Sequence, residues 1–297
     1  MIINYNPLLM MLWKIDHNIM IISNFSHWGD NENQLIARAK KLRLNSEKIA
    51  LMNLQTTTSR QESLLSDEII ELWAKSEQID YVINYVVGDY EQQFGLENLF
   101  RGIQKNLHAD QVVMNSDFFI NNQIISEKFL NKTFGSRAVH LIPTITEGSL
   151  IAKLTAALHK GKVEEYYQLT GGYFSYQGII DQGKQVGRKI NYPTTNVKVS
   201  PNFVLKQGVY ATINWLTTQE TPILGMSCYW TNSDGDYLIE TNLFDFNQDL
   251  YHQVIRTEFV AYLRDLCVVE NLDELKVLLK NDEVNSRKKL TGKQNDK

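Results

Sequence analysis

The first half of the chain alternates continuous apolar runs with amphipathic segments. Apolar runs of the kind found in buried parallel strands occupy residues 18–24, 48–54, 81–87, 111–114 and 139–142. Apolar residues at helical spacing follow in 34–42, 67–75 and 96–107. A further helix is predicted from about Ser149 to His159, ending at Gly161. This alternation predicts an α/β, Rossmann-like domain with a doubly wound parallel sheet.

After about Gly171 strand patterns follow one another without helices between them. Apolar and polar positions alternate through 209–215, and turns are predicted at 217–221 and 231–236. This pattern predicts a small antiparallel β-barrel. We place the boundary near residue 165, which gives domains of residues 1–165 and 166–297.

One helix is predicted to close the barrel. Asn271 is a candidate N-cap, and Glu274 three residues later completes a capping box. Four leucines at helical spacing would lay this helix on the barrel: Leu272, Leu275, Leu278 and Leu279.

Composition narrows the classes of function. The chain has 297 residues, 43% hydrophobic and 22% charged, which suits two globular domains. A net charge of −4 without a basic block argues against nucleic acid as the partner. Two cysteines are too few for a disulfide framework. We expect a cytoplasmic protein without membrane attachment, because no apolar run reaches 18 residues and the segment 7–22 is interrupted by charge.

The most informative segment for chemistry runs from 178 to 196. Gly178, Gly183 and Gly187 would let the backbone approach an anion and turn through positive φ, while Lys184 and Arg188 would supply charge. A solvated hairpin is the alternative reading of the same residue types.

The segment ends in Pro-Thr-Thr-Asn. Thr194 and Asn196 lie two residues apart in a predicted extended stretch, so their side chains would face the same side. Both offer the hard oxygen ligands that Mg²⁺ prefers. Together with the glycine-rich loop, they indicate a site for a nucleotide and its metal ion.

These motifs resemble one known family. The pattern Gly-Arg-x-x-x-(aromatic)-Pro-Thr-x-Asn, followed by Gly-Val-Tyr-Ala at 208–211, is similar to the kinase module of the prokaryotic bifunctional riboflavin kinase and FMN adenylyltransferase (FAD synthetase) family. The stretch 239–246 resembles the family segment that holds the catalytic glutamate. Residues 262–264 and 272–275 resemble its flavin-side stretch and C-terminal helix.

The resemblance implies roles for particular residues. Thr194 and Asn196 would hold Mg²⁺ and the terminal phosphates of ATP, with the glycine loop around the nucleotide. Glu240 would be the base that takes the proton of the ribityl hydroxyl of riboflavin as FMN forms. Arg264 would belong to the flavin side. By residue type alone, Glu240 is a strand-end carboxylate facing water.

The N-terminal half departs from the same family. Its phosphate-binding loop aligns with residues 24–33, and Gly29 and Glu32 stand where the family has two histidines. A carboxylate there would repel the ATP phosphates. Two other signatures, at 115–121 and 150–155, have lost their charged and glycine residues. We expect this domain to remain as a scaffold or partner surface without adenylyl transfer, and its protein partner is not identified by the sequence.

Three functions therefore compete. The first is a riboflavin kinase that depends on ATP and Mg²⁺. The second is a non-catalytic flavin-binding sensor, carrier or regulator, suggested by departures on the flavin side at 225–230, His252 and Val269. The third is full bifunctional FAD synthesis, which the altered loop disfavours. Glu240, Thr194 and Asn196 favour the first, since binding alone requires no base.

Overall fold

The computed structural model describes residues 2–9, 15–44, 47–56, 62–120, 123–145, 149–181, 192–248 and 250–291. The chain divides into two compact units, 1–153 and 154–297.

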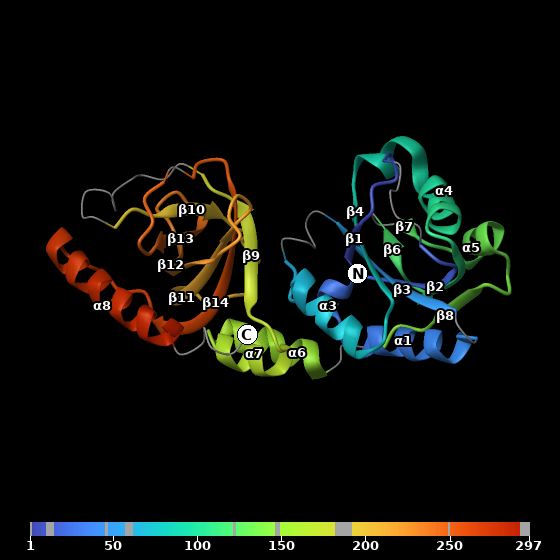
Figure 1. The fold of residues 1–297 in the computed structure, drawn as a ribbon, viewed down its shortest axis with the longest axis horizontal. Coiled ribbons are helices and arrows are strands. Elements are labelled where there is room, and N and C mark those ends of the chain that lie inside the picture. Colours follow the sequence, from blue (N-terminus) through green and yellow to red (C-terminus); the bar gives the residue numbers. More distant parts are fainter. Residues whose placement is uncertain are drawn as a thin grey trace. The chain divides into compact units, whose positions relative to one another are not determined.

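The first unit is built on six parallel strands in the order β1-β4-β3-β2-β5-β8 (Figure 1). The strands are β1 Ile2–Asn4, β2 Asn18–Ser23, β3 Lys48–Thr56, β4 Tyr81–Val87, β5 Ala109–Asn115 and β8 Val139–Ile142. A short hairpin, β6 Phe119–Ile120 and β7 Gln123–Ile124, follows β5. The predicted parallel α/β sheet is confirmed, with β1 as an edge strand that the sequence pattern did not indicate.

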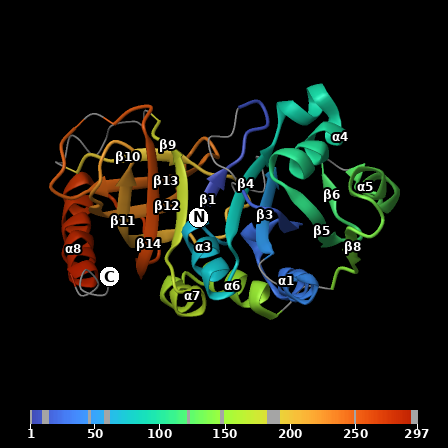
Figure 2. The ribbon, with the colours of Figure 1, turned by 45° about the vertical axis from the view of Figure 1, so that its right-hand side comes forward.

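Helices cover both faces of this sheet (Figures 1 and 2). They are η1 Phe25–His27, α1 Asp30–Leu42, α3 Asp67–Ser76, α4 Asp89–Asn106 and α5 Glu127–Phe134. The next helix, α6 Ser149–His159, contains the division between the two units. Leu99 and Phe100 of α4 pack with Met20 and Met52 in one core, while α1 contacts β2 and β5 from the other face. Because successive side chains of a strand point to opposite faces, both faces of β2 and β3 are buried.

The second unit is an antiparallel barrel. Its strands follow the order β10-β13-β12-β11-β14-β9. They are β9 Phe174–Ile179, β10 Thr195–Lys198, β11 Gly208–Leu216, β12 Ile223–Thr231, β13 Tyr237–Leu243 and β14 Val254–Arg264. A bridge between Asp181 and Asn196 joins the two edges, with Asp181 N donating to Asn196 O at 2.8 Å. The predicted barrel is thus confirmed.

Two helices pack on the barrel, α7 Val163–Thr170 on β14 and β9, and α8 Leu272–Thr291 on β11, β12 and β14. Alternation along β11 places Tyr210 against Phe259, whereas Ala211 belongs to the apolar cluster that includes Leu279 of α8. Asn271 caps α8 as predicted, accepting from Glu274 N at 2.9 Å. Leu272 of the predicted apolar face is half exposed, because it begins the helix beyond the barrel contact.

The units separate between Lys153 and Leu154, inside α6. The end of α6 already belongs with the barrel, since Lys206 N donates to the Leu158 carbonyl at 2.9 Å. The predicted boundary near residue 165 falls within α7, a helix that the sequence pattern did not separate. None of the described helices combines the length and apolar character needed to cross a bilayer.

Candidate functional site

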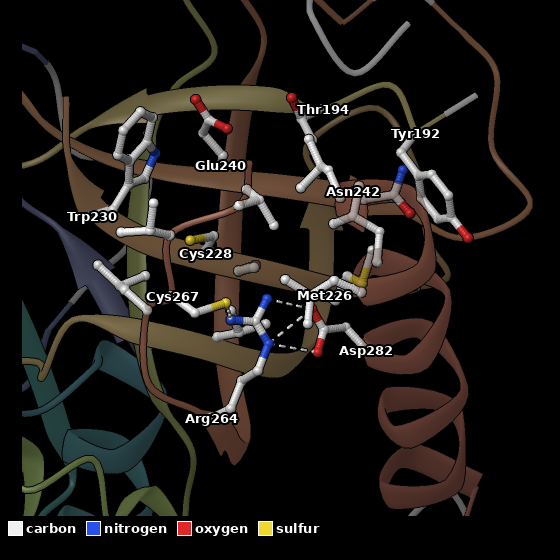
Figure 3. A pocket seen from close by; sticks show the side chains of 18 residues that line it. Tyr192, Thr194, Met226, Cys228, Trp230, Glu240, Asn242, Arg264, Cys267 and Asp282 are labelled. Atoms are coloured by element: carbon white, nitrogen blue, oxygen red, sulfur yellow. Dashed lines mark hydrogen bonds and ion pairs between the residues drawn. The ribbon is translucent and has the colours of Figure 1, made fainter. Parts of the chain in front are cut away.

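A cavity of about 430 Å³ lies between the barrel and α8 (Figure 3). Much of its wall is apolar, from Val209 and Met226 on the strands to Leu275, Leu278 and Leu279 on the helix. Polar side chains gather at particular points of the wall, among them Thr194, Glu240, Arg264 and Asp282. Such a cavity suits a largely apolar planar ligand with a few fixed polar contacts.

Glu240 enters the cavity from β13. It pairs in register with Cys228 of β12 and Asn196 of β10, so these three side chains share a face of the sheet. Burial raises the pKa of the Glu240 carboxyl, and the neighbouring Trp230 indole partly offsets that rise. A half-buried carboxylate with a raised pKa is a suitable proton acceptor near neutral pH.

The Pro-Thr-Thr-Asn segment lies next to Glu240. Asn242 Nδ2 donates to the Pro193 carbonyl at 2.8 Å and thereby ties the segment to β13. Thr194 is exposed and extends toward the same end of the cavity as Glu240 (Figure 3), whereas Asn196 is buried. β10 begins at Thr195, so Thr194 precedes the regular strand. The structure therefore brings Thr194, Asn196 and Glu240 to one region.

Thr194 also lines a second cavity of about 580 Å³. This cavity has a more polar wall that includes Thr195, Thr241, Asn247 and Gln248. The two cavities thus share the Thr194 side chain, one on the side of α8 and the other on the side of the β13–β14 connection.

The position of Gly178 differs from the predicted phosphate-binding loop. It lies within β9, opposite Ile255, and does not adopt positive φ. Its role is close packing, because a Cβ there would stand 2.3 Å from Val197 Cγ1. Gly183, Lys184, Gly187 and Arg188 lie outside the described residues.

Arg264 lines the cavity, but its guanidinium is engaged by the protein. Nε and Nη2 bind the Asp282 carboxylate at 2.9 and 2.7 Å, and Nη1 donates to the Asp265 carbonyl at 2.9 Å. Asp282 is only 4% exposed, so the pair holds α8 to the end of β14. Figure 3 shows this pair at the opposite end of the cavity from Thr194.

Several wall residues were not singled out from the sequence. Asn242 could have been, because it follows Glu240 by two positions and so shares its face. Tyr192 and Asp282 could not have been identified from the sequence, because their positions depend on how α8 docks. Tyr192 OH, for example, donates to Glu283 of α8 at 3.1 Å.

The altered loop of the first unit is filled by its own side chains. Glu32, 7% exposed, accepts from Ser23 Oγ and Gly29 N, both at 2.9 Å. Its carboxylate therefore occupies the start of α1, where backbone N–H groups favour an anion. Phe25 and Trp28 are buried in the same loop. Burial also lowers the pKa of His27.

Comparison with known proteins supports the family resemblance. Residues 170–290, within the second unit, match the riboflavin kinase (flavokinase) family model. The chain is similar to the bifunctional riboflavin kinase/FMN adenylyltransferase of Buchnera aphidicola, with 28% identity over 186 residues, 59% of each protein. The corresponding protein of Mycoplasma pneumoniae is 24% identical over 206 residues, 68% of this chain and 75% of that protein.

The chain thus spans about three fifths of the Buchnera relative. The Mycoplasma match is longer than the second unit, so the likeness reaches into the first. The predicted family resemblance is confirmed. A crystal structure titled macrolide-efflux protein from Streptococcus pneumoniae shares the fold, with a TM-score of 0.57 and 21% identity over 92% of this chain and 95% of that one.

Proposed function

We propose that this chain is a riboflavin kinase that transfers the γ-phosphoryl group of ATP to the ribityl 5′-hydroxyl of riboflavin. The observation that carries the proposal is the meeting of two cavities at Thr194, beside the Glu240 carboxylate. The apolar cavity under α8 suits the isoalloxazine ring, and the polar cavity suits the nucleotide. Their common border is where the hydroxyl and the γ-phosphate must meet.

Glu240 is the base in this reaction. As the riboflavin oxygen bonds to the γ-phosphorus, the bond between that phosphorus and the β–γ bridging oxygen breaks, ADP leaves, and the hydroxyl proton passes to the carboxylate. Burial raises the pKa of Glu240 and so strengthens it as a proton acceptor. The apolar wall of leucines from α8 limits water around the reacting hydroxyl.

Thr194 and Asn196 are the proposed protein ligands of Mg²⁺. Thr194 lines the same cavity as Glu240, and Asn196 pairs in register with Glu240 across β10 and β13, although it lines neither cavity. Hydroxyl and amide oxygens are a donor set that fits this ion. When bound with ATP, Mg²⁺ neutralises charge on the transferred group. In the described residues no cluster of three or more His, Cys, Asp and Glu side chains could hold a metal ion.

We further propose that adenylyl transfer is lost from the first unit. The Glu32 carboxylate lies at the start of α1, and the buried Phe25 and Trp28 fill the loop around it. A nucleotide phosphate would have to displace an internal anion that already accepts hydrogen bonds from Ser23 Oγ, Gly29 N and Asn31 Nδ2.

Incubation with riboflavin, ATP and Mg²⁺, followed by chromatographic separation of flavins, tests both parts. We expect FMN to accumulate without FAD. Stoichiometric flavin binding without phosphorylation would overturn the kinase proposal and favour a flavin sensor or carrier. FAD above a no-enzyme control would instead show that the chain is bifunctional.

A further inference from the structure

The first unit contains a cavity apart from the altered loop. It measures about 410 Å³ and lies at the carboxyl ends of β1, β3 and β4. Open α/β sheets bind ligands outside the carboxyl ends of their strands. None of residues 24–33 lines this cavity, which we call the amide cavity.

The wall of the amide cavity consists mainly of carboxamides and tyrosines. Asn4, Gln55 and Asn84 contribute amide-bearing side chains, and Tyr85 and Tyr90 contribute rings. No Lys, Arg or His lines it in the described part of the chain, while the acidic Asp67 does. Phosphate sites use cationic side chains or free backbone N–H groups. The negative charge of Asp67 disfavours phosphorylated ligands at this wall.

An incompletely bonded amide pair adjoins the cavity. Asn84 of the wall lies in register with Asn53, and Asn53 Nδ2 donates to Asn84 Oδ1 at 3.2 Å. Asn84 Nδ2 and Asn53 Oδ1 have no hydrogen-bond partner, although both residues are more than nine-tenths buried. Exchanging the oxygen and nitrogen of both amides leaves the same deficit, one donor and one acceptor. A buried donor or acceptor without a partner destabilises the fold, and a ligand that supplies the partner removes that cost.

The mouth of the amide cavity offers apolar and aromatic surface. Leu8 lines it and is 65% exposed. The rings of Tyr90 and Phe94 pack with centroids 5.0 Å apart, and Tyr90 faces the cavity. Flat ligands stack on such rings, while carboxamides pair with the adjacent donors and acceptors of a heterocycle.

We propose that the amide cavity binds an uncharged, planar nitrogen heterocycle of nucleobase type. The Asn84 amide forms hydrogen bonds with the polar edge of the heterocycle, and the Tyr90 ring stacks on its face. This site is independent of the proposed kinase chemistry, since it lies entirely within the first unit.

Saturation-transfer NMR on the full chain tests the proposal with adenosine, guanosine, cytidine and uridine as probes. We expect at least one nucleoside to bind, and its 5′-monophosphate to bind at least fivefold more weakly. Asn84→Leu keeps the branched skeleton of four side-chain heavy atoms but removes the amide, and it should weaken binding at least tenfold, as should Tyr90→Leu. Asn4→Ala, at an exposed wall position, tests the site without altering the core and should weaken binding by about threefold.

Thr194→Val is the matched control, because it changes the proposed ATP site of the other unit. Nucleoside binding that survives Thr194→Val but falls in Asn84→Leu or Asn4→Ala supports the amide cavity. No binding by any of the four nucleosides, or binding lost only in Thr194→Val, overturns it. Riboflavin phosphorylation should be unchanged in Asn4→Ala, so a failure of this proposal is distinguishable from a failure of the kinase proposal.

Discussion

At the scale of single residues, Glu240 combines a half-buried position with a partner segment that could hold a metal ion. Its strand position follows from the sequence, because alternation along β13 determines which residues share its face. Its burial does not, since that depends on Trp230 from β12 and on the docking of α8. The distinction matters because burial, rather than residue type, sets the pKa.

Glu240→Gln should lower turnover roughly 100-fold or more, the usual scale for loss of a positioned base. The activity of the unmodified protein should fall as the pH is lowered through the raised pKa of Glu240, so the acid limb of the rate profile should lie above the ordinary range of a glutamate. Rates measured with saturating riboflavin and MgATP from pH 4 to 9 check both. A loss of less than threefold would exclude Glu240 as the base.

The same substitution should affect stability in the opposite direction. Burial disfavours the charged carboxylate, so the folded protein favours the protonated form of Glu240. The stability of the fold is therefore greatest below the unfolded-state pKa of this group and falls as the pH rises through its folded-state pKa. Glu240→Gln should therefore raise the melting temperature at pH 8 and leave it unchanged near pH 4. An equal change at both pH values would indicate a packing effect instead.

At the scale of elements, α8 provides one wall of the cavity proposed for riboflavin, and the Arg264–Asp282 pair attaches the helix to β14. The sequence predicted the helix and its cap but assigned Arg264 to the flavin side. In the structure Arg264 forms an ion pair with Asp282 of α8, and its contact with flavin stays a prediction. The sequence alone cannot decide whether Arg264 binds a ligand or forms an ion pair, because its partner lies 18 positions away on another element.

Asp282→Asn should loosen α8 and raise the KM for riboflavin at least fivefold, while kcat changes less than twofold. Breaking a fully buried pair costs about 3–5 kcal/mol, and we expect the lower part of that range or less because Arg264 remains 26% exposed. Steady-state kinetics and thermal unfolding measure the two effects. Restored stability in the double variant Arg264→Met/Asp282→Leu, with KM still raised, would indicate that the pair contacts flavin directly.

At the scale of the whole molecule, apolar patterning predicted both architectures and many of their elements. Tyr81–Val87 and Val139–Ile142 match the predicted strands residue for residue. The pattern missed β1, whose three residues carry too little periodicity, and α7, which follows α6 after a short turn. Local motifs were enough to name Thr194, Asn196 and Glu240 as candidate site residues, whereas the cavities depend on the tertiary packing of distant segments.

The two units should respond differently to nucleotide. MgATP should raise the melting temperature of the second unit, because ligand stabilisation grows as RT ln(1 + [L]/Kd), and should leave the first unit unchanged. Calorimetry of the full chain would resolve the transitions. Thr194→Val should reduce the shift of the second unit with little effect on the protein without ligand. A MgATP shift of the first unit would contradict the proposed loss of its nucleotide site.

Glu32 has a consequence for how the first unit can be controlled. A carboxylate belonging to the same helix acts as a tethered competitor, and its effective concentration does not fall when the protein is diluted. Mobile phosphates in solution must outcompete it, so ordinary changes in nucleotide level leave the helix start occupied by Glu32. Under the proposed function, the first unit is thereby insulated from the nucleotide pool that supplies the second, and we expect the two halves of the chain to be regulated separately.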